Sequence, residues 1–477
     1  MTDRREDPVS ESASHAVVIS PIAETPGLPW YRNVPRYAWV VLIISALGWL
    51  FDTMDQNIFN LVRQPAVTSL LHPGLVVSAL TKAQQTALTA EVASAGGNMT
   101  AIFLLGWAVG GLFFGVVGDR LGRTRTMMIT ILIYALFTGL SGLTHNLFWF
   151  GVFRFLTALG VGGEWAAGAA LVAETFPSRS RPMALGLLQA CSAIGNMMAA
   201  IVTLLIPVFL SALALRGDNW RWAFAVGALP ALLVLWIRRS VKEPGKWEAA
   251  REAAAKTNDH NELGAISQLF TDPILRRNTI AAVLMAAAGV AGFWGVGNWT
   301  PELTKVALTP LHLSDSDLNI RKSMVFLIQN FGAFFGAYSY AWLAERTNRR
   351  QSLGLFFVLA FCAIQGMFWT AHSFLSLMIW APILGFCLLG PFSAYTVYFP
   401  ELFPTRLRTT GCGFCYNCAR ILAAAAPFTL GQLTGFFNNS HPGEGFRWAA
   451  SVVACVYALG IVGLLLAPET KGKPLPE

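Results

Sequence analysis

Charge is scarce in this chain. Asp, Glu, Lys and Arg make up 13% of its 477 residues, whereas soluble globular domains carry roughly 25%. Hydrophobic side chains make up 55% of the residues, and the mean hydropathy is +0.52. So little charge cannot cover the surface of a water-soluble molecule of this length. The composition therefore predicts an integral membrane protein.

The chain also lacks the usual marks of an enzyme or a metalloprotein. No nucleophile–base pair, metal-ligand set or phosphate-binding loop stands out. The seven cysteines show no disulfide framework. Cys412, Cys415 and Cys418 are spaced like ligands of an iron–sulfur cluster. However, they fall on one predicted helix, where each step of three residues turns the side chain to a different direction. We therefore expect no enzymatic activity, no metal and no cofactor.

Long apolar runs, in contrast, recur along the whole chain. A helix needs about 20 apolar residues to cross roughly 30 Å of hydrocarbon, and the runs predict twelve such spans. They lie near residues 37–62, 99–118, 126–144, 148–173, 183–210, 221–239, 278–300, 323–343, 352–371, 375–398, 410–437 and 447–467. The predicted fold class is an all-α integral membrane protein with twelve transmembrane helices.

The distribution of Lys and Arg predicts the orientation. When the arginines at span ends are counted with the side that they reach, 24 of the 34 Lys and Arg residues fall on the side of the two termini and 8 on the other side, and Arg154 and Arg420 are left in the membrane. By the positive-inside rule both termini lie in the cytoplasm, and the net charge of +8 needs no nucleic-acid partner. The polar first ~30 residues lack a signal-peptide pattern, so we expect the first span to direct membrane insertion.

An internal repeat divides the spans into two sets of six. The segment "ETFPSRSRPMALG" at 174–186 realigns with "ELFPTRLRTTGCG" at 401–413, an offset of 227 residues, and Glu243 recurs as Glu469 at an offset of 226. Duplicated bundles around a central cavity are typical of secondary transporters. The predicted parts are a cytoplasmic tail (1–36), a first bundle (37–239) with an outer loop of unassigned role (63–98), a cytoplasmic central loop with a surface helix (240–276), a second bundle (277–467) and a cytoplasmic tail (468–477).

The turn between spans two and three carries a recognisable signature. "GVVGDRLGRTR" at 115–125 resembles that of the major facilitator superfamily at Gly115, Asp119, Arg120, Gly122 and Arg123. Glycines permit close helix approach, and Asp119 can pair with arginine or face a helix N-terminus. The resemblance implies an inner gate at these residues.

The second half carries a weaker counterpart of this gate. "AWLAERTNRR" at 341–350 keeps Glu345 and Arg346 but lacks the glycines. We therefore expect a looser closure there.

Other segments resemble a narrower group within the superfamily. "FDTMD" at 51–55 resembles the Asp-Gly-x-Asp element of the aromatic acid:proton and the sialate or monocarboxylate:proton symporters, with Thr53 in place of glycine. The segments 160–177 and 411–427 also look like these organic-anion symporters, whereas "PETKGKPLPE" at the C-terminus looks like the tail of sugar and metabolite:proton symporters.

Ionisable residues within the first and fourth spans are candidates for proton coupling, because such groups are costly in a membrane unless they serve a function. Asp52 and Arg154 come to roughly the same depth at ~1.5 Å per residue, which predicts an ion pair between them. Asp55 lies on a neighbouring position of the helix, where repulsion favours a proton on one of the two carboxylates. Alternatively, Asp55 reaches the outer interface and Asp52 only satisfies Arg154. Glu164 is a proton site, a gate or a packing element.

Arg420 is the candidate receptor for a substrate carboxylate. It follows Tyr416 by four residues and Asn417 by three, so the three share one helix face near mid-membrane. A guanidinium group offers a bidentate fork to a carboxylate. The plainer reading is that Arg420 caps helix carbonyls or pairs with a neighbour in span ten. Further candidates for substrate contact are Gln189, Asn196, Tyr395, Tyr398 and Asn298, the last as part of an outer gate or of an interfacial belt.

These features favour proton-coupled uptake of a small organic acid by alternating access, in a bacterial inner membrane, by a protein that we expect to be monomeric. Protons, the organic acid and the lipid bilayer are then its partners. Two alternatives stay open. Sugar or polyol symport fits the tail motif but would not require Arg420, and a metabolite sensor is disfavoured by the short tail and central loop.

Overall fold

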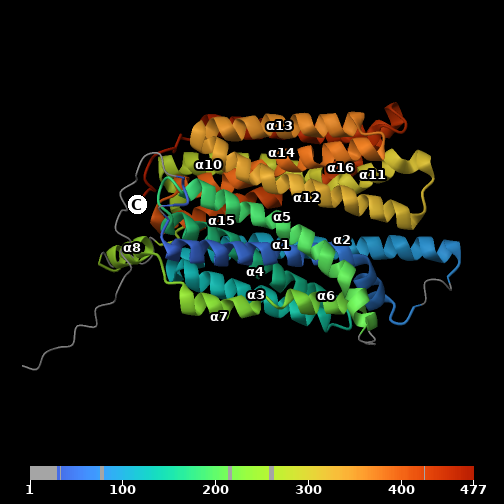
Figure 1. Cartoon of the computed structure of the whole chain (residues 1–477), viewed down its shortest axis with the longest axis horizontal. Coiled ribbons are helices and arrows are strands. Elements are labelled where there is room, and N and C mark those ends of the chain that lie inside the picture. Colours follow the sequence, from blue (N-terminus) through green and yellow to red (C-terminus); the bar gives the residue numbers. More distant parts are fainter. Residues whose placement is uncertain (1–28, 33, 76–79, 213–217, 257–262, 424) are drawn as a thin grey trace, which may run out of the picture.

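The computed structural model describes residues 29–32, 34–75, 80–212, 218–256, 263–423 and 425–477. These residues form a bundle of long helices without strands (Figure 1). The first half comprises α1 (Arg36–Leu71), α2 (Lys82–Leu121), α3 (Arg123–Gly142), α4 (Leu147–Thr175), α5 (Arg181–Ala212), α6 (Asn219–Gly227) and α7 (Ala231–Ser240). Two short helices, α8 (Gly245–Lys256) and α9 (Gln268–Thr271), follow before the second half.

The second half repeats the arrangement with more interruptions. It comprises α10 (Pro273–Gly295), η3 (Gly297–Trp299), α11 (Thr300–Leu308), η4 (Thr309–Leu311), α12 (Asp315–Arg346), α13 (Arg349–Thr370), α14 (Phe374–Leu402), η5 (Thr405–Leu407), α15 (Arg408–Ala423), α16 (Ala425–Ser440), α17 (Gly445–Ala454) and α18 (Tyr457–Leu466). In Figure 1 the first half, blue to green, lies below the second, yellow to red.

Ten helical segments among the described residues are long and apolar enough to cross a membrane. The all-α membrane fold is thus confirmed. The two remaining predicted spans, 323–343 and 410–437, coincide with α12 and with α15 and α16. Helix α12 is less apolar because it carries polar side chains such as Asn330 toward the interior. Helices α15 and α16 have 16 residues each, which is shorter than a span requires.

Two helix pairs join the halves. Helix α5 packs along α12, and α2 packs along α15. Small residues permit this approach: a Cβ added at Gly115 of α2 would lie 3.1 Å from the carbonyl oxygen of Thr409 in α15. The space between these pairs is where a ligand could reach both halves.

The predicted outer loop at 63–98 is largely helical. Helix α1 continues to Leu71, and α2 begins at Lys82, where Thr81 and Gln84 form a capping box. Apolar residues of these extensions, including Val67 and Leu70, pack in one buried cluster with residues of α5 and α6. The sequence predicted that the spans end at 62 and begin at 99, but this cluster supports helices beyond those predicted ends.

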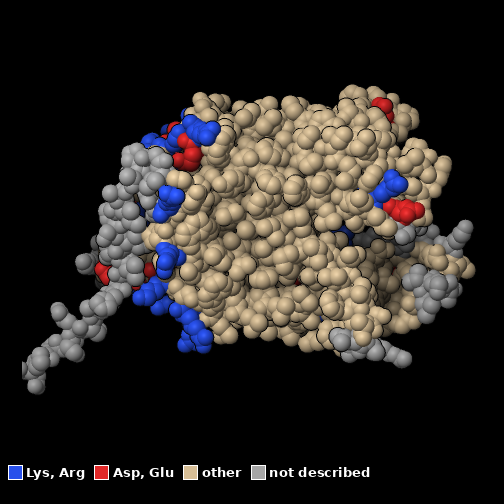
Figure 2. All heavy atoms as spheres, viewed as in Figure 1, with Lys and Arg blue, Asp and Glu red and all other residues tan. Residues whose placement is uncertain are grey.

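Positive charge gathers at one end of the bundle, seen on the left of Figure 2. We call it the basic end; it carries α8 and the residues Arg120, Arg125, Arg238, Arg239, Arg346 and Arg350. The predicted surface helix of the central loop is α8, and its Trp247 is buried and donates from Nε1 to the carbonyl oxygen of Asp119 at 2.7 Å. The surface is hollowed toward the opposite end (Figure 2).

Candidate functional site

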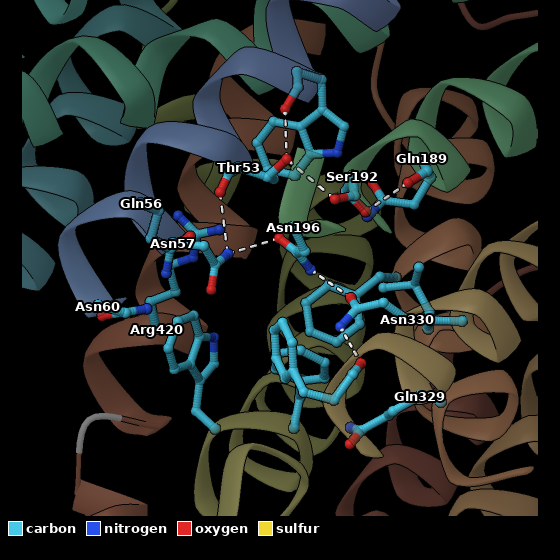
Figure 3. Close-up of a pocket in the computed structure, with 18 of the residues that line it drawn as sticks. Thr53, Gln56, Asn57, Asn60, Gln189, Ser192, Asn196, Gln329, Asn330 and Arg420 are labelled. Atoms are coloured by element: carbon cyan, nitrogen blue, oxygen red, sulfur yellow. Dashed lines mark hydrogen bonds between the residues drawn. The ribbon is translucent and has the colours of Figure 1, made fainter. Parts of the chain in front are cut away.

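A polar cavity lies between the two halves (Figure 3). It encloses about 770 Å³ of empty space, including the part open to solvent, a size suited to a small molecule. Helices α1, α2 and α5 line it from the first half, and α10, α12, α14 and α15 from the second. The lining residues are Trp49, Thr53, Gln56, Asn57, Asn60, Trp107, Gln189, Ser192, Asn196, Phe293, Trp294, Phe326, Gln329, Asn330, Ala333, Gly385, Leu389, Phe392, Tyr416 and Arg420.

Arg420 is held between two aromatic rings on the wall of this cavity. Its guanidinium carbon lies 3.4 Å from the ring centroid of Trp107 and 4.3 Å from that of Tyr416. Tyr416 in turn stacks on Trp165 at 4.4 Å. The stack interleaves α15 of the second half with α2 and α4 of the first, so it fixes the plane of the guanidinium group.

The stack leaves hydrogen-bonding capacity on Arg420 unused. Its Nε and Nη1 atoms are buried and have no hydrogen-bond partner in the part of the chain that the structure describes. The side chain is 8% exposed. Aromatic faces stabilise the positive charge without occupying its N–H groups, so these groups still lack a hydrogen-bond acceptor.

A chain of three asparagines crosses the cavity from one half to the other. Asn57 of α1 donates to Oδ1 of Asn196 in α5 at 2.7 Å, and Asn196 donates to Oδ1 of Asn330 in α12 at 2.8 Å (Figure 3). The amides at the two ends of this chain also donate to backbone carbonyl oxygens, which can only accept. Asn57 donates to the carbonyl oxygen of Thr53 at 3.0 Å, and Asn330 donates to that of Phe326 at 2.9 Å. The carbonyls thereby fix the orientation of the amides.

Two carboxylates lie beside the cavity without a hydrogen-bond donor. Asp52 of α1 and Glu164 of α4 are each 1% exposed. None of their four oxygens has a partner among the described residues. Asp52 lies within electrostatic range of Glu164 and of Arg420. Because two carboxylates can share a hydrogen bond only if one is protonated, this pair is suited to hold a proton.

The predicted ion pair between Asp52 and Arg154 is wrong. Arg154 contacts Asp55 instead: its Nη1 and Nη2 lie 3.3 and 3.4 Å from Oδ2 of Asp55. Thr138 donates to the other carboxylate oxygen at 2.9 Å. The rings of Phe59 and Phe103 surround the guanidinium group at 4.7 and 4.5 Å. Depth arithmetic brought Asp52 to the level of Arg154, but Asp55 is the aspartate that faces Arg154, and it is buried and does not reach the outer interface.

Several predicted substrate contacts lie outside the cavity lining. Asn417 turns away, donates to the carbonyl oxygen of Gly413 at 2.7 Å and packs against Gly111 of α2. Tyr395 donates to the carbonyl oxygen of Met285 at 2.7 Å, and Tyr398 donates to that of Pro468. All three are buried among helices. The side chain of Asn298 lies outside the described residues.

The signature segment closes the basic end between the halves. The carboxylate of Asp119 accepts from the backbone N–H groups of Thr409 and Thr410 at 3.2 and 2.8 Å. Arg123 lies 3.1 Å from Asp119 and donates to the carbonyl oxygen of Thr405 at 2.6 Å. These contacts join α2 and α3 to η5 and to the start of α15.

Glu174 and Arg408 reinforce this closure, and neither was among the predicted gate residues. Oε1 of Glu174 lies 3.1 Å from Arg123 and 2.6 Å from Arg408 of the second half. They occupy the repeated segments 174–186 and 401–413. That repeat was the signal that could have identified them.

Other predicted gate residues make contacts on their own side of the interface. Arg120 donates to the carbonyl oxygen of Leu263 in the central segment at 3.1 Å. Gly122 has a φ of 109°, and a side chain there would meet the carboxylate of Glu243. Glu345 contacts Arg349 at 2.8 Å, and Arg346 stacks on Trp342. The expectation that Glu345 and Arg346 form a gate between the halves is not met by these contacts, which stay within the second half.

Comparison with known proteins identifies the family. Residues 46–427 match the sequence profile of the Major Facilitator Superfamily, which covers most of the chain. The chain belongs to the major facilitator superfamily. It is therefore a membrane transporter and not an enzyme.

Individual relatives align with nearly the whole chain. It is 31% identical over 427 residues to the probable 4-methylmuconolactone transporter of Cupriavidus pinatubonensis, covering 89% of each protein. It is 27% identical over 471 residues to the niacin transporter NiaP of Acinetobacter baylyi, covering 93% of this chain and 97% of the relative. Among solved structures, the proton:xylose symporter XylE matches with a TM-score of 0.69 and 17% identity over 92% of this chain and 98% of the symporter. The likeness to this symporter shows the fold alone.

Within this major facilitator fold, sequence reasoning missed most of the cavity's amide side chains. Gln56, Asn57 and Asn60 follow the FDTMD segment within one or two turns, and Gln329 and Asn330 interrupt an apolar stretch of α12. A polar amide within a predicted span was the available signal, and it was followed only for Gln189, Asn196, Asn298 and Asn417. Of these, Gln189 and Asn196 line the cavity, together with Tyr416 and Arg420.

Proposed function

We propose that the protein takes up a small organic anion together with protons, by alternating access of the cavity to the two sides of the membrane. The observation that carries this proposal is the buried guanidinium group of Arg420, which lines the cavity and has unpartnered nitrogen atoms. A buried charge without a partner is costly. A carboxylate of the substrate would supply that partner through charge-assisted hydrogen bonds.

The proton would be carried by Asp52 and Glu164. Their carboxylates are neighbours without a donor, whereas Asp55 is neutralised by Arg154. Asp52 also attracts Arg420 electrostatically. When Asp52 is ionised it competes with the substrate for Arg420, and when it is protonated it releases Arg420 to the substrate. This competition would couple the two binding events.

The relatives support an acid as the substrate. Their names give 4-methylmuconolactone and niacin, which are both small ring compounds that carry a carboxyl group. The aromatic walls of this cavity, including Phe293, Trp294 and Phe392, suit a ring of that size. We therefore propose that the present chain also transports a small organic acid, and we do not assign it a single compound.

The orientation follows from the same proposal. The basic end would face the cytoplasm, as the positive-inside rule favours, and this orientation places both tails and α8 there. The contacts between Asp119, Glu174 and the start of α15 would then form the inner gate. The bundles at 37–239 and 277–467 would be the two bodies that move, and the bacterial inner membrane remains the proposed location of a monomeric transporter.

Uptake into proteoliposomes tests the proposal. With an inward proton gradient, labelled organic acids should accumulate, and Arg420→Gln should abolish their binding, a loss of about 2–5 kcal/mol. Arg420→Lys retains the charge but not the planar fork, so weakened affinity with residual transport is expected.

Sugar symport is the second candidate, favoured by the many amide side chains in the cavity. A neutral sugar has no use for a guanidinium group that is stacked and unpaired. If Arg420→Gln left uptake of the true substrate intact, the organic-anion proposal would fail and the sugar would take its place.

A further inference from the structure

The buried charges around the cavity limit what a substrate can bring with it. Arg420 is the one ionisable lining residue apart from Tyr416 in the described part of the chain, and it lies on one side of the cavity (Figure 3). Its Nε and Nη1 atoms have no hydrogen-bond partner among these residues. A positive charge at this depth needs a counter-charge nearby.

The other arginine buried at this depth is already neutralised. Nη1 of Arg154 lies 3.3 Å from Oδ2 of Asp55, and both side chains are buried. This pair adds no net charge, with or without a substrate. The phenol of Tyr134 also lies within electrostatic range of the acidic residues, but a phenol is neutral at physiological pH. Neither group can therefore balance the charge of Arg420.

Asp52 and Glu164 can supply the counter-charge while the cavity is empty. Both carboxyl groups are buried, and each lies close enough to act on the other. Two neighbouring carboxyl groups in an apolar site do not both ionise, so the pair keeps one proton and carries one negative charge. Arg420 attracts Asp52, which favours the negative charge on Asp52 and the retained proton on Glu164.

A bound anion changes this balance. Its carboxylate replaces Asp52 as the partner of Arg420, so an Asp52 that stayed ionised would be one uncompensated negative charge inside the membrane. A single proton on Asp52 removes this charge. A divalent anion would still leave one negative charge, because no further Lys, Arg or His lines the cavity in the described part of the chain. Moving such a charge through hydrocarbon is costly.

We propose that each transport cycle carries one proton and one monovalent organic anion, and so moves no net charge across the membrane. The proton binds a carboxylate oxygen of Asp52 on the outer side and leaves it on the inner side, whereas Glu164 keeps its proton throughout. The proposal rests on the proposed function, because it presumes that Arg420 binds the carboxylate of the substrate.

Uptake by the purified protein in proteoliposomes tests this stoichiometry. The probes are labelled nicotinate, quinate and shikimate, which are small ring acids with one negative charge at neutral pH. Protein-free liposomes and liposomes with Arg420→Gln give the passive entry of each acid, which is subtracted. Uptake of labelled isophthalate, a dianion at neutral pH, should be lower than that of the accepted monoanion by about tenfold or more.

Two driving forces are applied separately. With a pH difference of one unit, acidic outside, and the membrane potential held at zero, one proton per anion predicts an accumulation of about tenfold, and two protons predict about 100-fold. With equal pH and about 100 mV, negative inside, one proton per monovalent anion predicts no accumulation, whereas two protons predict about 50-fold.

Variants of the two carboxyl groups test which of them keeps its proton. Glu164→Gln imitates a carboxyl group that never ionises, so it should retain the tenfold accumulation even if the rate falls. Asp52→Asn should lose accumulation and retain exchange of labelled for unlabelled acid. Glu91→Gln is the matched control, because it removes an exposed carboxylate that contacts His72 outside the cavity, and it should behave as the parent.

The outcomes separate this proposal from the proposed function. If acids enter through Arg420 but the membrane potential drives their accumulation, or isophthalate enters as fast as the monoanions, the stoichiometry is wrong and the proposed function stands. Loss of accumulation in Glu164→Gln, with exchange retained, would show that Glu164 releases its proton and would likewise contradict the proposal. If none of the acids enters through Arg420, the proposed function fails and this inference fails with it.

Discussion

Two aspartates three residues apart on α1 occupy opposite chemical situations. Asp55 has a hydroxyl donor and a guanidinium partner, so its negative charge is compensated inside the membrane. Asp52 has neither, and it faces a second carboxylate, Glu164. The same residue type therefore serves as a permanent half of an ion pair at one position and as a group free to take up a proton at the other.

This contrast predicts separate effects of replacing the two aspartates. Asp52→Asn should abolish accumulation driven by a proton gradient, because the amide cannot release a proton. Exchange of labelled for unlabelled substrate requires no proton release and should persist. Both activities are measured in the same proteoliposomes. Uphill uptake retained by Asp52→Asn would remove this residue from the coupling mechanism.

Asp55→Asn serves as the contrast. This change leaves the charge of Arg154 without a carboxylate partner, next to the rings of Phe59 and Phe103. Breaking a buried ion pair in this way lowers the stability of the fold by about 3–5 kcal/mol. We therefore expect Asp55→Asn to lower the thermal stability of the purified protein, whereas Asp52→Asn should leave the stability unchanged or increase it.

At this scale the sequence singles out individual residues more readily than it pairs them. Intramembrane charge singled out Asp52, Asp55, Arg154 and Arg420. The partner of Arg154 could not be predicted, because two positions separated by about 60° around α1 differ little in depth, and only the packing of α1 against α4 distinguishes them. The roles of these residues in transport stay predictions.

At the scale of helices, two glutamates from distant segments hold the starts of α3 and α13. Glu243 accepts from the backbone N–H groups of Thr124 and Arg125 at 3.2 and 3.0 Å. Glu469 accepts from those of Arg349 and Arg350 at 3.1 and 3.2 Å. The offset of 226 residues between the glutamates predicted a repeat, and the structure gives its physical meaning: each half caps its third long helix in the same way.

The pKa of Glu469 leads to a pH-dependent prediction. Burial alone would raise this pKa, but the backbone N–H groups that donate to the carboxylate outweigh burial and hold the pKa below the ordinary value of 4.5. A depressed folded-state pKa means that the carboxylate stabilises the fold above that ordinary value, and that the benefit disappears as the pH falls through the lowered pKa.

Glu469→Gln should accordingly lower the stability at neutral pH by about 1 kcal/mol. The gap to the wild type should close as the solution is acidified below the lowered pKa. Thermal unfolding of the two purified proteins across this pH range measures both effects. Glu444→Gln is the control, since Glu444 is exposed and makes no side-chain cap bond to α17. A gap that does not change with pH would contradict the role assigned to the ionised carboxylate.

The helices themselves were largely predictable, and the exceptions have a common cause. A hydropathy pattern locates a transmembrane span when lipid-facing apolar side chains make up most of the segment. It misplaced the outer ends of α1 and α2, because their extensions pack against protein residues such as Val92 and Leu210 instead of lipid. Contacts of this kind depend on which helices become neighbours, which a hydropathy pattern does not contain.

In the whole molecule, the halves are joined by different chemistry at different depths. Charged groups and backbone N–H donors join them at the basic end, through Asp119 and Glu174. Amides join them at mid-depth, where Asn196 meets Asn330. Each of these asparagines is the sixteenth residue of a 32-residue helix. Rocking of two bodies displaces atoms least near the centre, so the closure that has to break for the cavity to open lies at the basic end.

This arrangement predicts the effect of weakening that closure. In Asp119→Asn the amide oxygen can accept from only one of the N–H groups of Thr409 and Thr410, and the attraction to Arg123 is reduced. The closed state should lose about 1–3 kcal/mol, so the population should shift toward states that are open at the basic end. Glu243→Gln is the matched control, because Glu243 lies at the same end but contacts only its own half.

Spin labels at Arg125 and Gln351 report the separation of the halves at this end. Both residues are exposed, at the starts of α3 and α13, and the exposed cysteines Cys362 and Cys455 would first be replaced. Asp119→Asn should broaden the distance distribution toward longer separations, and Glu243→Gln should leave it as in the parent. Equal shifts in both variants would indicate general loosening of the basic end. No shift in Asp119→Asn would mean that the remaining contacts of Glu174 with Arg123 and Arg408 suffice to keep the halves together.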